Sequence, residues 1–172
     1  MSEWIIPPLT LCLGAGLVVT LFVVARAVTV VPVGHAGLVE RLGKFQRVLD
    51  PGTNVVFPFV DRVVKISTGE RKTTFRTEPV RSTDGRLVQT VVSVVYDVAD
   101  PARARYGVGD ISKAIERLAF DVDRTVVARM DTTAALSGSE RIRRQIQIAL
   151  NANAPTWGIR IREVAVPDIR GI

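Results

Sequence analysis

The segment of residues 5–25 contains no charged side chain, and this feature constrains the chain more than any other. As a helix it would be roughly 30 Å long, which matches the hydrocarbon core of a bilayer. A cleaved signal peptide would begin with basic residues, whereas the only charged side chain before the segment is Glu3. A buried core helix is disfavoured, because the segment is terminal and apolar on all sides. We therefore predict a membrane anchor at 1–27, with a transmembrane helix at about 5–25.

Flanking charge predicts the orientation of this anchor. Arg26, Arg41, Lys44 and Arg47 follow the segment, and positively charged flanks stay on the cytoplasmic side. We expect a single pass through the cell membrane with the main domain facing the cytoplasm. The chain carries a net charge of +6. Such a surface either attracts anionic lipid headgroups or nucleic acid, or is simply a solvated basic surface.

The first half of the remaining chain has the pattern of β-strands. Strands are predicted at 28–33, on both sides of Gly43 as a hairpin, at 62–67, at 71–80 near a sheet edge, and at 87–98, with turns at 34–37 and 82–85. In the strand at 87–98 the even positions are mostly apolar and the odd positions are mixed. This alternation predicts a strand with one buried face.

The second half changes to a helical period. Asp110 is a predicted cap for a helix to about Met130, with its apolar stripe at Ile111, Ile115, Leu118, Val122 and Val126. A capping-box pattern at 137–140 predicts a second helix, which we expect Pro155 to end, and a last strand follows at 159–166. The order predicts an α+β fold with a mostly antiparallel sheet and two packed helices.

The stretch at 50–62 (DPGTNVVFPFVDR) is unusual for a water-soluble loop. Its large apolar residues are interrupted by Pro58, which cannot donate a hydrogen bond to a neighbouring strand. The run is therefore a poor central strand, and it is too short to span a membrane.

No arrangement of residues typical of an active site is present. His35 is the only histidine and Cys12 the only cysteine, which excludes an intramolecular disulfide and a cysteine-based metal site. The common nucleotide-binding, zinc-protease and serine-hydrolase motifs are missing. Asp121 and Asp123 stand two apart on a predicted helix, and we interpret them as a solvated face. The sequence thus predicts no catalytic, cofactor or metal site, and no enzyme.

A series of short motifs resembles the stomatin/prohibitin/flotillin group, called the SPFH or Band 7 family. The matching stretches, in order, are 31–32 (VP), 38–43 (LVERLG), 51–63 (PGTNVVFPFVDRV), 84–85 (DG), 95–101 (VYDVADP), 139–142 (SERI) and 157–159 (WGI). Each motif is weak alone, but their order and spacing are specific. The resemblance implies an SPFH domain at 28–169, followed by a tail at 170–172.

The resemblance also implies a function. Relatives are membrane-attached scaffolds that form homo-oligomers or hetero-oligomers with related proteins, organise microdomains and restrain proteases or channels, without an active site of their own. In relatives the region matching Val55, Val56, Phe57, Pro58 and Phe59 packs against the bilayer surface, so these residues are the predicted membrane-contacting loop. The alternative is that these side chains fill the domain core.

The sequence departs from the family pattern at its C-terminal end, and two alternative functions are considered. Stomatin-like relatives continue into a long helix that forms a coiled coil, whereas this sequence ends at Ile172, so we interpret it as a short member or a fragment. One rival is a membrane-tethered hydrolase with an unrecognised site, which requires titratable groups gathered in a pocket. The other is a nucleic-acid-binding domain, which we disfavour. It requires one continuous patch of Arg141, Arg143, Arg144, Arg160 and Arg162.

Overall fold

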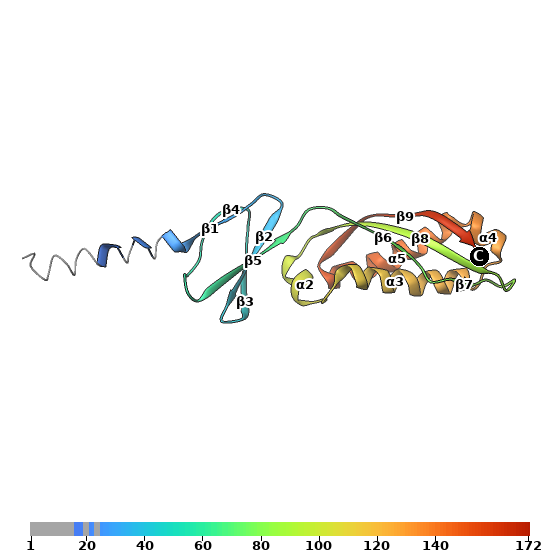
Figure 1. Cartoon of the computed structure of the whole chain (residues 1–172), viewed down its shortest axis with the longest axis horizontal. Helices are drawn as coiled ribbons and strands as arrows, with labels where there is room; N and C mark the ends of the chain where they lie inside the picture. The colour runs from blue at the N-terminus through green and yellow to red at the C-terminus, as the bar shows by residue number, and fades with distance from the viewer. Residues whose placement is uncertain (1–15, 19–20, 23–24) are drawn as a thin grey trace, which may run out of the picture. The chain divides into compact units, whose positions relative to one another are not determined.

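Residues 16–18, 21–22 and 25–172 are described by a computed structural model of the chain (Figure 1). They divide into two compact units, Met1–Ile66 and Ser67–Ile172. The transmembrane helix predicted at about 5–25 lies largely outside the described residues. Within the described ranges, no helix has both the length and the apolar character needed to cross a bilayer.

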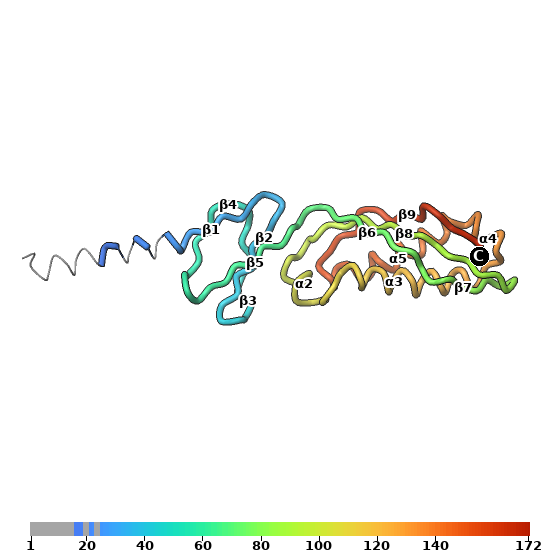
Figure 2. Tube along the Cα trace, in the orientation of Figure 1, coloured from blue at the N-terminus to red at the C-terminus, as the bar shows by residue number. Residues whose placement is uncertain are grey.

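The first unit contains two small sheets, and Figure 2 traces the path of its chain. One pairs β1 (Val28–Val31) with β4 (Gly52–Val55), and the other has the order β3-β2-β5, formed by β3 (Lys44–Leu49), β2 (His35–Arg41) and β5 (Asp61–Ser67). The core of this unit is small, and Val63 packs against it. Its buried members are Val31, Val39, Leu49 and Val56.

The hairpin predicted around Gly43 is confirmed, because β2 and β3 pair up to Arg41↔Lys44. Gly43 has a φ of +81°, which glycine adopts without the steric cost of a Cβ. The turn predicted at 34–37 is shorter than expected, since β2 already begins at His35. Part of the 50–62 stretch is also strand rather than loop, as β4 pairs with β1 from Val31↔Gly52 to Val28↔Val55.

The second unit contains one antiparallel sheet built around β8 (Leu87–Val98). This strand pairs with β6 (Arg71–Arg76), with β7 (Val80–Arg81) and, along its length, with β9 (Ile159–Gly171). The alternation predicted for 87–98 is confirmed. The even positions are all buried: Val88, Thr90, Val92, Val94, Tyr96 and Val98.

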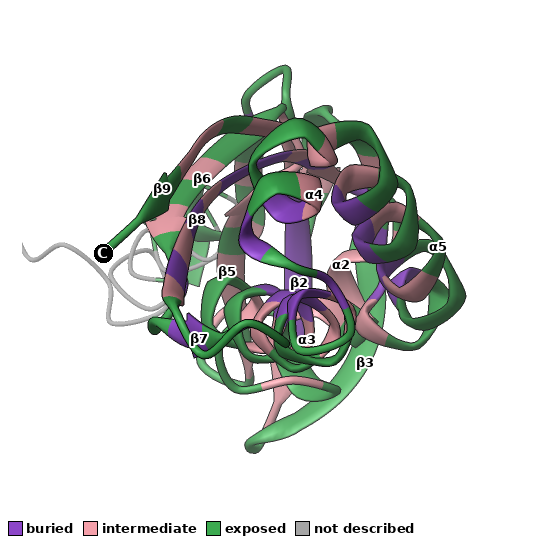
Figure 3. Ribbon diagram, turned by 90° about the vertical axis from the view of Figure 1, so that its right-hand side faces the viewer, coloured by how far each residue is buried: buried purple, intermediate pink, exposed green. Residues whose placement is uncertain are grey.

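Four described helices accompany this sheet: α2 (Pro101–Tyr106), α3 (Ile111–Val127), α4 (Thr132–Ser137) and α5 (Ser139–Trp157). The two long helices were predicted and the two short ones were not. In Figure 3 buried positions follow β8 and mark α4 and α5, whose outer sides are exposed. The helices contribute Ile115, Ile142, Ile146 and Leu150 to the core, all fully buried.

Three local predictions for this unit are wrong. The capping box at 137–140 does not form, because Gly138 occupies the N-cap of α5 without a side-chain bond and the Ser137 hydroxyl donates to the Thr133 carbonyl at 2.9 Å. Pro155 lies inside α5, which continues to Trp157 and ends at Gly158. Asp123 is not on a solvated face, since its side chain points into the core and is fully buried.

Candidate functional site

The predicted membrane-contacting loop divides into exposed and buried members. Phe59 is 85% exposed, Val55 66% and Phe57 65%, and Pro58 is half-buried. Val56 is 6% exposed and packs in the small core of the first unit. Its inclusion among surface residues is therefore corrected, because successive side chains of an extended segment point to opposite sides. The remaining members present two aromatic rings to the exterior.

Asp61 holds the two ends of this loop together. Its carboxylate accepts the Phe57 backbone N–H at 3.0 Å, and its own N–H donates to the Phe57 carbonyl at 3.0 Å. Arg41 donates two further hydrogen bonds to the same carboxylate, at 2.8 and 3.2 Å. The bonds from Arg41 and then Phe57 lower the pKa of Asp61. Asp61 therefore stays ionised at neutral pH, which keeps the loop closed.

The same arginine fixes the position of one exposed ring. The Arg41 guanidinium carbon lies 5.2 Å from the centre of the Phe57 ring, a distance at which a cation and an aromatic face attract each other. The Arg41 side chain therefore contacts both the Asp61 carboxylate and the Phe57 ring. The ring is held in place although most of its surface has no protein neighbour.

Phe59 has an unfavourable backbone conformation. Its φ is +75°, in the left-handed region that costs a residue with a Cβ about 1–2 kcal/mol. Burial does not compensate, because the side chain is the most exposed of the loop. A strained and exposed aromatic residue is poorly explained by the stability of the isolated chain.

Exposed apolar residues also occur outside the predicted loop. Val28 and Val55 are directly opposite each other in the β1–β4 pair, so their side chains share one face. Both are exposed, as is Val30 two residues further along β1. We name this set of exposed residues the apolar surface: Val28, Val30, Val55, Phe57 and Phe59. Sequence reasoning missed its β1 members, although the alternation of Val28, Thr29 and Val30 is visible there.

This surface begins next to the end of the uncharged segment. The Val56 backbone N–H donates to the Ala27 carbonyl at 2.8 Å, which ties the loop to the residue directly before β1. A cleft of about 450 Å³ lies in the same unit and includes Phe22, Arg26, Phe59 and Lys65 in its lining. The arrangement places aromatic surface beside positively charged side chains.

In the part of the chain that the structure describes, the titratable groups elsewhere do not combine a nucleophile with a basic partner. His35, the only histidine, begins β2 in the first unit. In the second unit Ser82 contacts Asp84, whose carboxylate also accepts the Thr132 hydroxyl at 2.8 Å and the Thr132 N–H at 3.3 Å. Hydrogen bonds from Ser82 and then Thr132 lower the pKa of Asp84 to about 2. This cluster fixes the 82–85 turn to the start of α4, and a carboxylate of such low basicity is a poor general base. Among the described residues, no three His, Cys, Asp or Glu side chains are grouped to hold a metal.

The arginines of the nucleic-acid hypothesis are largely paired with acids. Arg143 bonds Glu140 and Gln147, Arg144 lies 3.7 Å from Glu140, and Arg162 donates twice to Asp97 at 2.9 and 3.0 Å. Of the five side chains that the hypothesis needs, these three are therefore partly neutralised. This pairing weakens the hypothesis that the five arginines form a polyanion-binding patch.

The family model of the SPFH domain / Band 7 family matches residues 29–170. An uncharacterized protein of Methanocaldococcus jannaschii is 30% identical over 152 residues, which are 88% of this chain and 76% of the relative. A second, from Methanothermobacter thermautotrophicus, is 31% identical over 133 residues, 77% of this chain and 42% of the relative.

A relative with a descriptive name is also found. Stomatin-like protein 2, mitochondrial, of Rattus norvegicus is 31% identical over 140 residues, which are 81% of this chain and 40% of the relative. The chain therefore spans about two fifths of the length of some relatives that it matches.

Proposed function

This chain belongs to the SPFH domain / Band 7 family, and we propose that it is a membrane-anchored scaffold that oligomerises and holds other membrane proteins in place. Its partners in this proposal are the lipid bilayer, further copies of itself or related SPFH proteins, and a membrane protease or channel. The scaffold raises the local concentration of its partners and carries out no bond chemistry. It sits in the cell membrane by a single N-terminal pass, with both described units in the cytoplasm.

The apolar surface is the observation that carries this proposal. Its aromatic members are mostly exposed, and one of them has a strained backbone. Burying a Phe or Val side chain in the interfacial region of a bilayer is favourable by about 1.5–3 kcal/mol when burial is complete. The hydrogen bond from the Val56 N–H to the Ala27 carbonyl links the loop to the residue at which the predicted anchor ends. Cations in the adjacent cleft add attraction to anionic headgroups.

The depth of Phe59 in the bilayer tests the membrane part of the proposal. The whole chain, with Cys12→Ser and Phe59→Cys, is labelled with an environment-sensitive fluorophore and reconstituted in vesicles of neutral and anionic phospholipid. Emission should shift to shorter wavelength, and quenchers attached to lipid should act more strongly than iodide in the water. The matched control is Ile148→Cys, which is also exposed but lies on α5. If the label at position 59 showed the same emission and quenching as the label at position 148, lipid contact by the loop would be refuted.

Self-association is tested separately. The chain solubilised in mild detergent should have a protein mass above that of the monomer when light scattering is corrected for bound detergent. A monomer at micromolar concentration would contradict oligomerisation by the chain alone. Crosslinking in native membranes, followed by identification of the attached proteins, then distinguishes copies of the chain from a protease or channel.

A further inference from the structure

The second unit contains a groove that the membrane-facing function does not use. One hollow, of about 320 Å³, is lined by the strand residue Phe75, by Thr77 and Glu78, and by Lys113, Glu116, Arg117 and Phe120 of α3. A second, of about 380 Å³, continues from Glu78 and Phe120 to Arg81, Arg124 and Ala128. The two hollows are adjacent, because they share Glu78 and Phe120. We name the pair, which lies between segment 75–81 and α3, the α3 groove.

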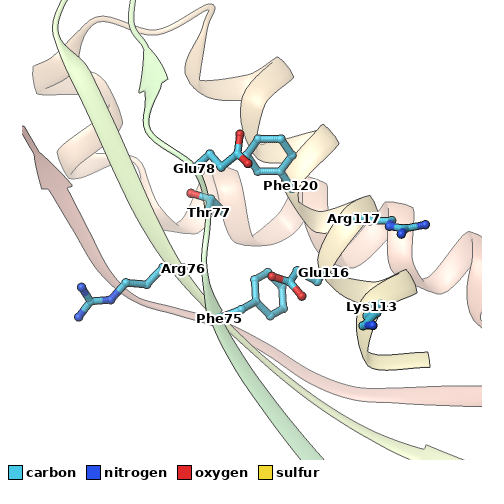
Figure 4. Close-up of a pocket in the computed structure, with 8 residues that line it drawn as sticks. All are labelled: Phe75, Arg76, Thr77, Glu78, Lys113, Glu116, Arg117 and Phe120. Atoms are coloured by element: carbon cyan, nitrogen blue, oxygen red, sulfur yellow. The ribbon is translucent and has the colours of Figure 1, made fainter. Parts of the chain in front are cut away.

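The middle of the α3 groove is apolar. Figure 4 shows the rings of Phe75 and Phe120 reaching the same hollow from its two walls, whereas Arg76 points to the other side of its strand. Both rings are half-buried, so each keeps surface that a ligand could cover. Lys113 and Arg117 of α3 are also among the lining residues, although in Figure 4 the Arg117 guanidinium points away from the two rings. The site therefore combines an aromatic floor with a charged rim.

The charges of the groove are unequal. Lys113, Arg117 and Arg124 on α3 and Arg81 on β7 are opposed by only two acids in the lining, Glu78 and Glu116. Lys113 lies 4.0 Å from Asp110. Within the described part of the chain, Arg81, Arg117 and Arg124 are exposed and have no ion-pair partner. The excess positive charge of the lining complements an acidic ligand.

The length of the groove favours an extended ligand. Its α3 wall runs from Lys113 to Ala128, about 22 Å at the helical rise per residue. An extended peptide of about seven residues covers that length. In the sheet, β6 pairs only with β8 among the described strands. Its other edge can therefore accept a further strand, a common way in which domains bind peptides. The β6 residues that line the groove are Phe75 and Arg76.

We propose that the α3 groove binds an extended acidic segment of a partner protein, which pairs with the β6 edge and places an apolar side chain between Phe75 and Phe120. This proposal rests on the scaffold function and names the chemistry of one partner. It concerns the second unit alone, so it can fail while vesicle contact by Phe59 and self-association stand.

Peptide binding to the whole chain tests the proposal. The probes are fluorescein-labelled ten-residue peptides in which Glu or Asp alternates with Val, Leu or Phe, with Lys-for-acid peptides as controls. Fluorescence anisotropy with the chain in detergent should show binding of acidic peptides that weakens with salt. Arg117→Glu/Arg124→Glu should weaken it at least about tenfold, as expected for the loss of complementary charge.

A matched double variant separates the groove from the overall charge. Arg105→Glu/Arg160→Glu makes the same change in net charge at exposed positions outside the groove, and affinity should stay within about twofold, because rim charges at other sites contribute little. On peptide binding, backbone amides of β6 should exchange more slowly with deuterium. Equal weakening by both double variants, unchanged β6 exchange, or no binding of any acidic peptide would each overturn the proposal.

Discussion

Arg41, at the end of β2, donates two hydrogen bonds to Asp61, at the start of β5, and leaves the Asp61 side chain only 1% exposed. The strands that carry the two residues are neighbours in one sheet. The loop that contains Phe57 and Phe59 therefore ends at a fixed residue, to which the Phe57 N–H also bonds. This support matters because, on a flexible loop, the exposed rings would pack against the first unit instead of staying accessible.

Asp61→Asn should loosen this loop without unfolding the unit. The amide still accepts one hydrogen bond but loses its charge, so the pair with Arg41 and the bond from Phe57 N–H weaken. At neutral pH, we expect the Phe57 amide to exchange with deuterium about tenfold faster. Asp50→Asn, at an exposed position ahead of the loop, should leave exchange unchanged. Equal protection of Phe57 in both variants would show that Asp61 does not hold the loop.

Phe59→Gly should separate stability from membrane contact. Glycine tolerates a φ of +75°, so the free energy of unfolding should rise by up to about 1 kcal/mol. Phe59→Ala keeps the strain and should leave stability near that of the wild type. Both variants lack the ring, so both should bind vesicles more weakly to the same degree. The measurements are urea unfolding and vesicle partitioning of a chain shortened to 26–172. Equal unfolding midpoints for the two variants would argue against strain at Phe59.

Thr132→Val should change the titration of Asp84. The hydroxyls of Ser82 and Thr132 hold the pKa of Asp84 at about 2, so without the Thr132 hydroxyl it should move up toward 3.8. A lowered folded pKa gives stability above the unfolded pKa, and the wild type loses it between about pH 4 and pH 2. The Thr132→Val variant should lose less stability over that pH range. Thr133→Val, exposed on the same helix, is the control, and carboxyl carbon NMR shifts follow the titration. A pKa that stays at about 2 in Thr132→Val would contradict this role.

Asp123→Asn should stabilise the chain at neutral pH. Burial raises the pKa of Asp123, and neither carboxylate oxygen has a hydrogen-bond partner. The neighbouring Thr77 and Thr90 hydroxyls lower the pKa and oppose this shift, but burial is the larger cause. A raised folded pKa makes the wild type most stable below the unfolded value near 3.8, and this contribution is lost as pH rises through the folded pKa.

The expected gain for Asp123→Asn is about 1–2 kcal/mol at pH 7, with none at pH 3. Urea unfolding at both pH values measures it. Asp121→Asn, on the exposed side of the same helix, should change stability by less than about 0.5 kcal/mol at either pH. A loss of stability at pH 7 in Asp123→Asn would mean that the ionised carboxylate has a stabilising role.

The elements with strong periodicity were predictable from the sequence. The alternation over 87–98 predicted β8 to the residue, because a strand with one buried face must alternate. The pattern of α3 predicted the helix but placed the centre of its buried side wrongly. Besides Ile115, the buried positions are Ala119, Asp123 and Val127. A rule that places charged side chains on the solvent-exposed face of a helix cannot predict a buried aspartate at this position.

The short helices escaped prediction for a different reason. With six residues each, α2 and α4 have less than two turns in which to show a period. Their signals were the caps, since Asp100 accepts from Ala102 and Arg103 and Asp131 accepts from Ala134. The exposed loop members Val55, Phe57 and Phe59 could be proposed from the sequence, whereas the burial of Val56 depends on its neighbours in space.

The pairing of β8 with β9 implies an order of events during translation. The sheet of the second unit stays incomplete until β9 emerges from the ribosome, since β8 pairs with it from Val98↔Ile159 to Val88↔Gly171. The first unit draws its contacts from residues up to Ile66. Domains fold as units while synthesis proceeds from the N-terminus. The first unit can therefore complete its contacts while the unit that carries the α3 groove is still being made.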